Sequence, residues 1–101
     1  MAKLTIEELK TALKRLPDWQ IAKGREAIAR KFQFVDFDAA FAFMTRVALL
    51  AARMDHHPEW FNVYSKVEVT LATHDAGGVT RKDIDMATAM DGYAALMMDR
   101  R

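Results

Sequence analysis

The chain of 101 residues contains no cysteine, so disulfide bonds, thiol chemistry and cysteine-ligated zinc are excluded. No uninterrupted apolar run reaches the roughly 18 residues that a membrane-spanning helix requires. The first ten residues lack the apolar core and the cleavage site of a signal peptide. There is also no usable internal repeat, low-complexity tract or linker. We therefore expect a cytoplasmic protein without a membrane partner, built as one domain over residues 1–101.

The chain carries almost no excess charge of either sign. Lysine and arginine number 15 against 14 for aspartate and glutamate, which gives a formal net charge of +1. This balance provides no electrostatic reason to expect DNA, RNA or an anionic membrane as the main ligand. The apolar share of 51% and the charged share of 29% are ordinary for a globular domain with a modest core.

The first third of the chain predicts one helix and one hairpin. Thr5 and Glu8 have the spacing of a capping box, and leucines follow at helical spacing until a proline ends the pattern. Two strand-like runs, residues 19–21 and 26–34, are then separated by a lysine-glycine turn. Arg30 interrupts the apolar face of the second run.

The segment from Asp38 to Ala52 is the most apolar part of the chain. Its only polar residues are Asp38, Thr45 and Arg46, and either Asp36 or Asp38 is suited to begin the helix. A helix packed on one sheet needs an apolar stripe of only about 100°, whereas this helix is apolar nearly all round. We therefore expect a homo-oligomer that uses this helix, and the alternative is a helix that is merely rich in alanine.

The second half of the chain predicts two more strands and a final helix. From Phe61 onward the pattern has a period of two, which puts residues 67, 69 and 71 on one face and His74 on the opposite, more open face. Thr80 and Asp83 then have the spacing of a helix start. The order helix, strand, strand, helix, strand, strand, helix indicates an α+β fold with helices on one face of an antiparallel sheet.

The three histidines, His56, His57 and His74, surround this predicted pair of strands. One interpretation is a metal site, although adjacent histidines diverge and no HxH or HxxxH spacing is present. A second is acid–base catalysis without a cofactor, because an imidazole can both give and take a proton near neutral pH. A third is an unrelated surface pair and a strand-end histidine. The spacing alone leaves catalysis and this third reading equally open.

Two motifs, DHHPEWFNVY at 55–64 and TLATHD at 70–75, are together highly specific. They resemble the pterin-4a-carbinolamine dehydratases, the family that includes the dimerisation cofactor of a homeodomain transcription factor. The resemblance is dense from about Phe32 to Ile84. It implies a four-stranded antiparallel sheet with three helices on one face, and dimers or tetramers in contact through the second helix. It also implies dehydration of 4a-hydroxytetrahydropterin to quinonoid dihydropterin, which recycles the pterin used by aromatic amino acid hydroxylases.

The resemblance also implies which residues act, with no metal and no bound cofactor. His56 and His74 match histidines proposed as general acids toward the 4a-hydroxyl group. His57 matches the histidine that mainly binds and orients the pterin, with some function as a base. The segments that contact substrate match the residues Asp55, His56, His57, Ala72, Thr73, His74 and Asp75. Asp83 matches a signature aspartate, which we expect to be structural because it stands at a helix start.

The chain departs from the family pattern at Ala52, four positions before the first histidine, where an acidic or other polar residue is common. If that side chain normally orients a histidine or contacts the pterin, its absence lowers activity. An alternative function is a non-enzymatic interaction module, such as a transcriptional cofactor or assembly factor on the same fold. The intact set of three histidines favours the enzyme, because a scaffold has no chemical need for it.

Overall fold

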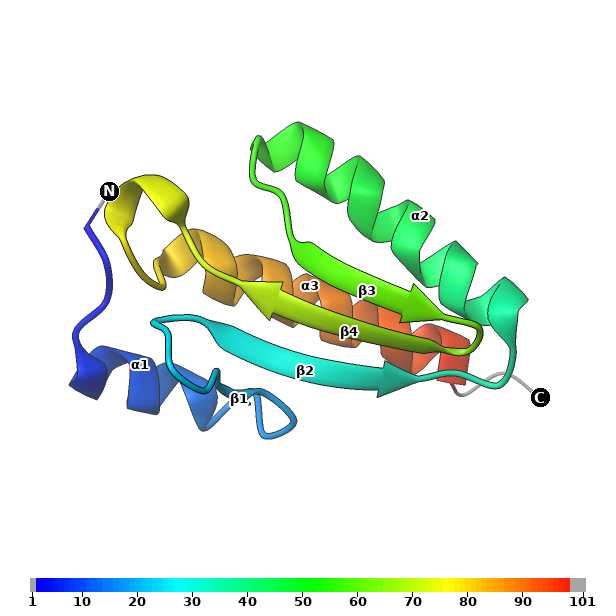
Figure 1. Ribbon diagram of the computed structural model, residues 1–101, viewed down its shortest axis with the longest axis horizontal. Coiled ribbons are helices and arrows are strands. Elements are labelled where there is room, and N and C mark those ends of the chain that lie inside the picture. Colours follow the sequence, from blue (N-terminus) through cyan, green and yellow to red (C-terminus); the bar gives the residue numbers. More distant parts are fainter. Residues whose placement is uncertain (1, 99–101) are drawn as a thin grey trace.

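The computed structural model describes residues 2–98 and contains one four-stranded antiparallel sheet, in the order β1-β2-β4-β3, with the helices packed on one face (Figure 1). This architecture confirms the predicted α+β fold. The elements in chain order are α1 (Ile6–Leu13), β1 (Gln20–Ile21), β2 (Ile28–Gln33), α2 (Phe37–Met54), β3 (Glu59–Val63), β4 (Lys66–Leu71), the 3-10 helix η1 (His74–Ala76) and α3 (Arg81–Met98).

Local signals fix where the first two helices begin. The hydroxyl group of Thr5 accepts from the backbone N–H of Glu8, and the Glu8 carboxylate accepts from the backbone N–H of Thr5, so the predicted capping box is present. Asp36, one of the two predicted caps, begins α2 by accepting from the backbone N–H of Ala39 at 2.9 Å. Each cap satisfies backbone donors that the first helical turn leaves unpaired.

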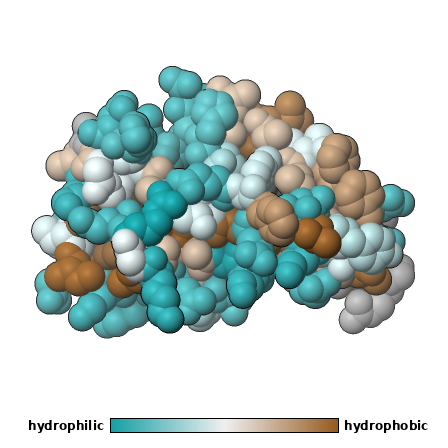
Figure 2. All heavy atoms as spheres, viewed as in Figure 1, coloured by the Kyte–Doolittle hydropathy of each residue, from teal (hydrophilic) through white to brown (hydrophobic). Residues whose placement is uncertain are grey.

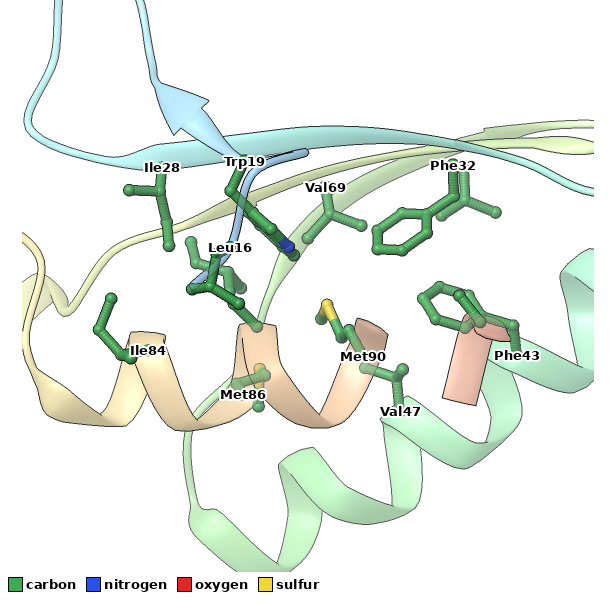
Figure 3. Packing of buried hydrophobic residues seen from close by; sticks show 14 of the residues in the cluster. Leu16, Trp19, Ile28, Phe32, Phe43, Val47, Val69, Ile84, Met86 and Met90 are labelled. Carbon is green, nitrogen blue, oxygen red and sulfur yellow. The ribbon is translucent and has the colours of Figure 1, made fainter. Parts of the chain in front are cut away.

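The core lies between the sheet and helices α2 and α3 (Figure 3). Phe32 of β2 packs against Phe43 of α2 with the ring centroids 4.7 Å apart, and Met86 and Met90 of α3 fill the space below the strands. All four side chains are fully buried. Burial of a side chain of this size contributes about 1.5–3 kcal/mol, so this layer holds the helices on the sheet.

Arg30, the charged residue on the inward face of β2, has partners inside the fold. Its guanidinium lies 2.6 Å from the carboxylate of Asp91 on α3 and 4.1 Å from the ring centroid of Phe32. The indole N–H of Trp19 donates to the same Asp91 oxygen at 2.8 Å. A charge is tolerated at the edge of the core because it is paired and hydrogen-bonded.

The strand that precedes His74 is shorter than the pattern predicts. β4 ends at Leu71, because its neighbours begin there: Ile28 of β2 pairs with Leu71, and Glu59 of β3 pairs with Thr70. The prediction that His74 lies on the open face of this strand is therefore wrong. His74 instead begins η1 and is exposed there.

Helix α2 keeps an apolar side that nothing within residues 2–98 covers. Phe37, Phe41 and Leu49, here called the outer side of α2, are all more than 40% exposed, and the two phenylalanine rings lie 5.6 Å apart. Figure 2 shows hydrophobic residues gathered along this part of the molecule. None of the helices within residues 2–98 combines the length and the apolar character needed to cross a membrane.

Candidate active site

The segments that carry the three histidines lie at the same end of the sheet (Figure 1). His56 and His57 fall between the end of α2 and the start of β3, and His74 follows the end of β4. The antiparallel pairing of Glu59 with Thr70 brings these two chain segments together. The β1–β2 turn and the start of α3 lie at this end as well.

The end of α2 sets the direction of the two adjacent histidines. Asp55 adopts a left-handed conformation with φ of 50°, which stops the helix. The backbone N–H of His56 then donates to the carbonyl oxygen of Ala51 at 3.1 Å. The His56 side chain is only 8% exposed, whereas Asp55 and His57 remain exposed.

His56 forms a buried pair with Asp83. Its Nε2 lies 2.6 Å from Oδ1 of Asp83, whose side chain is fully buried. The other carboxylate oxygen, Oδ2, accepts from the hydroxyl group of Thr73 at 2.8 Å and from the backbone N–H of Thr80 at 2.9 Å. Because a carboxylate accepts hydrogen bonds, we assign Nε2 of His56 as the donor in this pair. The other ring nitrogen, Nδ1, is left for other partners.

The expected role of Asp83 at the start of α3 is confirmed, and the side chain has a second role as the partner of His56. The bond from the Thr80 backbone N–H is the cap that the spacing predicts. The second role, holding His56, was missed, because no sequence spacing links two residues that the fold brings together. A fully buried aspartate with three donors is a feature that only the packed structure displays.

An open cavity of about 230 Å³ lies beside His74. Ala72, Thr73 and His74 line one part of it, and Gly77, Gly78 and the β1–β2 turn residues Arg25 and Glu26 complete it. Three of the predicted substrate-binding residues thus share this cavity, whereas Asp55, His56, His57 and Asp75 are not among its lining residues. Thr73 joins the two parts of the site, since it lines the cavity and also donates to Asp83.

Two ion pairs hold the β1–β2 turn at the rim of this cavity. Both terminal nitrogens of Arg25 donate to the two carboxylate oxygens of Glu59, each at 2.8 Å, and Lys3 pairs with Glu26 at 2.7 Å. The hydrogen bond from Arg25 holds the pKa of the Glu59 carboxyl below its ordinary value, and the same bond raises the pKa of Arg25. Sequence reasoning did not identify Arg25, Glu26 or Glu59.

The histidines do not assemble with other ligands into a metal site in the part of the chain that the structure describes. Within residues 2–98, no group of three histidine, aspartate or glutamate side chains is arranged to hold a metal ion.

Comparison with known proteins places this geometry in a family. A family model described as pterin 4 alpha carbinolamine dehydratase matches residues 2–93. A Rhodopseudomonas palustris (strain BisB18) protein named "Putative pterin-4-alpha-carbinolamine dehydratase" is 60% identical over 98 residues, which is 97% of each chain. A relative with the same name from Burkholderia multivorans (strain ATCC 17616 / 249) is 59% identical over 93 residues, or 92% of this chain and 91% of the relative.

A solved structure agrees with these relatives. The crystal structure of a transcriptional coactivator/pterin dehydratase from Brucella melitensis has 54% sequence identity to this chain and a TM-score of 0.90. The match covers 91% of this chain and 98% of the Brucella chain. The motifs, the fold and the comparisons lead to one conclusion: the chain belongs to the pterin-4-alpha-carbinolamine dehydratase family.

Proposed function

We propose that this protein eliminates water from 4a-hydroxytetrahydropterin to give quinonoid dihydropterin, and so acts in the recycling of a tetrahydropterin. Membership of the family supports the substrate class. The observation that carries the proposal is the buried His56–Asp83 pair, placed at the same end of the sheet as His57 and His74. We also propose a link to an aromatic amino acid hydroxylase, which would supply this substrate.

The reaction needs an acid and a base. The C4a–O bond breaks as the hydroxyl group takes a proton and leaves as water, and a proton is lost from the neighbouring ring nitrogen as the C4a–N double bond forms. We assign the acid role to His56 and His74. The carboxylate of Asp83 supports His56 in this role, because it holds the imidazole through Nε2 and leaves Nδ1 to face the departing hydroxyl group.

His57 has a different role in this proposal. Its side chain is exposed next to the buried His56, so it is free to bind and orient the pterin and to accept a proton as a base. Thr73 and Ala72 line the cavity beside His74, and we assign them to substrate binding with the exposed Asp55 and Asp75. This assignment needs no metal ion and no cofactor, since proton transfer alone completes the elimination.

The assembly we propose is a homodimer or homotetramer that buries the outer side of α2. An apolar strip with two neighbouring phenylalanine rings and Leu49 is costly to leave in water. The alternative function, an interaction module without catalysis, would use the same surface. It gives no reason for a fully buried aspartate to hold a histidine, and for that reason we propose the enzyme.

The test is stopped-flow measurement of the dehydration of 4a-hydroxytetrahydropterin against its spontaneous rate. We expect clear acceleration by the purified protein, and a loss of about a hundredfold in His56→Gln and in His74→Gln. Lys31→Gln on the exposed side of β2 serves as a control, and circular dichroism verifies that each variant folds. Full activity in both histidine variants would show that the site assignment is wrong, and no acceleration by the folded protein would overturn the proposed function.

A further inference from the structure

Two charged residues that line one wall of the cavity beside His74, Arg25 and Glu26, have no role in the catalytic assignment. Arg25, in the turn between β1 and β2, lines the same cavity as Thr73 and His74 although it lies far from them in the sequence. The turn and the 72–78 segment are brought together because β2 and β4 are neighbours in the sheet. A cationic side chain therefore stands beside the proposed catalytic histidine.

The guanidinium of Arg25 is held in a fixed orientation. Its two terminal nitrogens each lie 2.8 Å from one carboxylate oxygen of Glu59, and this two-point contact fixes the plane of the group. Both side chains are about half exposed, at 47% and 58%. Because ion pairs at such sites contribute little to stability, the main consequence of this pair is the orientation of Arg25.

Glu59 also connects this wall to the other part of the site. It is the first residue of β3 and lies two positions after His57. Through its carboxylate, the segment that carries His56 and His57 is tied to the turn that borders the His74 cavity. The pair thus spans the end of β4 and links the two chain segments that hold the histidines.

The donors that Arg25 has left match the acceptors of a pterin. Its guanidinium carries five N–H groups. The contact with Glu59 occupies one on each terminal nitrogen, and the other three make no hydrogen bond among the residues that the structure describes. The pyrimidinone ring of a pterin presents a carbonyl oxygen and ring nitrogens as acceptors. Glu26, the other charged residue of the wall, is already paired with Lys3 at 2.7 Å.

We propose that Arg25 is a substrate-binding residue that donates hydrogen bonds to the pyrimidinone ring of the pterin, and that Glu59 is the positioning residue that holds it. This inference rests on the proposed function for the identity of the ligand. It assigns the Arg25 wall of the cavity to the carbonyl-bearing edge of the pyrimidinone ring, with C4a toward His74. Arg25 then contributes to binding of substrate and transition state alike, and not to proton transfer.

The experiment measures two quantities for each variant of the full chain. Stopped-flow kinetics give kcat and KM for dehydration, and fluorescence quenching gives the Kd of unsubstituted pterin, a stable probe. Arg25→Met keeps an unbranched side chain and removes the donors, whereas Arg25→Lys keeps the charge without the two-point contact. Lys23→Met is the matched control, since Lys23 is exposed in the same turn but does not line the cavity.

We expect Arg25→Met to raise KM and the Kd of pterin about tenfold, as loss of such a hydrogen bond implies, with kcat changed less than about threefold. The KM and the Kd of pterin for Arg25→Lys should lie between those of the wild type and those of Arg25→Met. Glu59→Gln should raise KM by a smaller factor, and it should add nothing in the double variant with Arg25→Met, because Glu59 acts through Arg25. These results would support the inference.

Other results separate the inference from the proposed function. An active wild type with unchanged KM and Kd in Arg25→Met would overturn the inference alone. An inactive wild type that still binds pterin in an Arg25-dependent way would overturn the dehydratase function and keep the binding role. Failure of the wild type to bind pterin or accelerate the reaction would overturn both. If Arg25→Met did not fold, Arg25→Lys and Glu59→Gln would decide by the same criteria.

Discussion

The imidazole of His56 and the carboxylate of Asp83 form a hydrogen-bonded pair with Nε2 and Oδ1 2.6 Å apart, shielded from solvent at the end of the sheet. The two residues come from different elements, one following α2 and the other in the first turn of α3. Asp83 is itself fixed by Thr73 and by the backbone of Thr80. The imidazole of His56 is thus held by a residue that lies far from it in the sequence.

Replacement of this carboxylate tests the pair. Asp83→Asn keeps the shape of the side chain, but its amide cannot accept from His56, Thr73 and the Thr80 N–H at once. We expect kcat to fall about tenfold or more, as it does when a residue that orients a catalytic imidazole is lost. The ¹⁵N chemical shifts of the His56 ring should also show a changed tautomer, a signature that a purely structural role would not produce. An unchanged kcat would remove Asp83 from the mechanism.

The order of elements was predictable because its signals are local. The Thr5–Glu8 capping box and the Asp36 cap depend on residues three positions apart, and both are present. No local signal separates the exposed His57 from its buried neighbour His56. That burial depends on a partner in α3, which the one-dimensional pattern could not supply.

The end of β4 is a second feature that the sequence pattern could not predict. The alternation of apolar residues continues to Thr73, so the pattern predicts a strand that reaches His74. Pairing partners on both sides stop at Leu71, however, and Thr73 pairs with Gly78 instead. Strand length is set by neighbouring strands, just as the Arg25–Glu59 pair is set by two segments that meet only in the fold.

The Arg25–Glu59 pair predicts a dependence on pH. Because the pKa of the Glu59 carboxyl is lowered in the folded state by the hydrogen bond from Arg25, the pair stabilises the fold at pH values above the unfolded pKa of about 4.3. That contribution is lost as the pH falls through the lowered folded value. An NMR titration of the Glu59 carboxyl should give a pKa that rises toward the ordinary value in Arg25→Met and stays low in Lys23→Met.

The contact between Arg30 and Asp91 leads us to a prediction about the stability of the fold. Asp91→Ala leaves the guanidinium of Arg30 and the indole N–H of Trp19 without the carboxylate that both contact. We expect the free energy of unfolding in urea to fall by about 2 kcal/mol, since bonds to a charged group are lost near the core. Asp85→Ala, an exposed aspartate of the same helix, should change it by less than about 0.5 kcal/mol. Equal effects of the two variants would contradict the structural role of the pair.

The outer side of α2 predicts how the protein assembles. Leu49→Glu places a charge in the middle of the proposed interface, where it would be buried without a partner. Light scattering during gel filtration should then give the mass of a monomer in place of an oligomer. Leu96→Glu on α3 is the matched control, because Leu96 and Leu49 are 60% and 59% exposed. A monomeric wild type would contradict the assembly, and so would an equal loss of mass in both variants.

Ala52 allows the departure from the family pattern to be tested. If the acidic residue common at this position serves to orient a histidine, its absence matters little here, because Asp83 already holds Nε2 of His56. Ala52 is exposed in the last turn of α2, so Ala52→Glu should fold normally. We expect kcat to change less than about threefold, with the oligomer mass measured alongside to exclude an effect through assembly. A tenfold rise in kcat, at about 1.4 kcal/mol of transition-state stabilisation, would instead mean that a carboxylate at this position contacts the pterin. In that case the orientation of His56 by Asp83 would be insufficient for full activity.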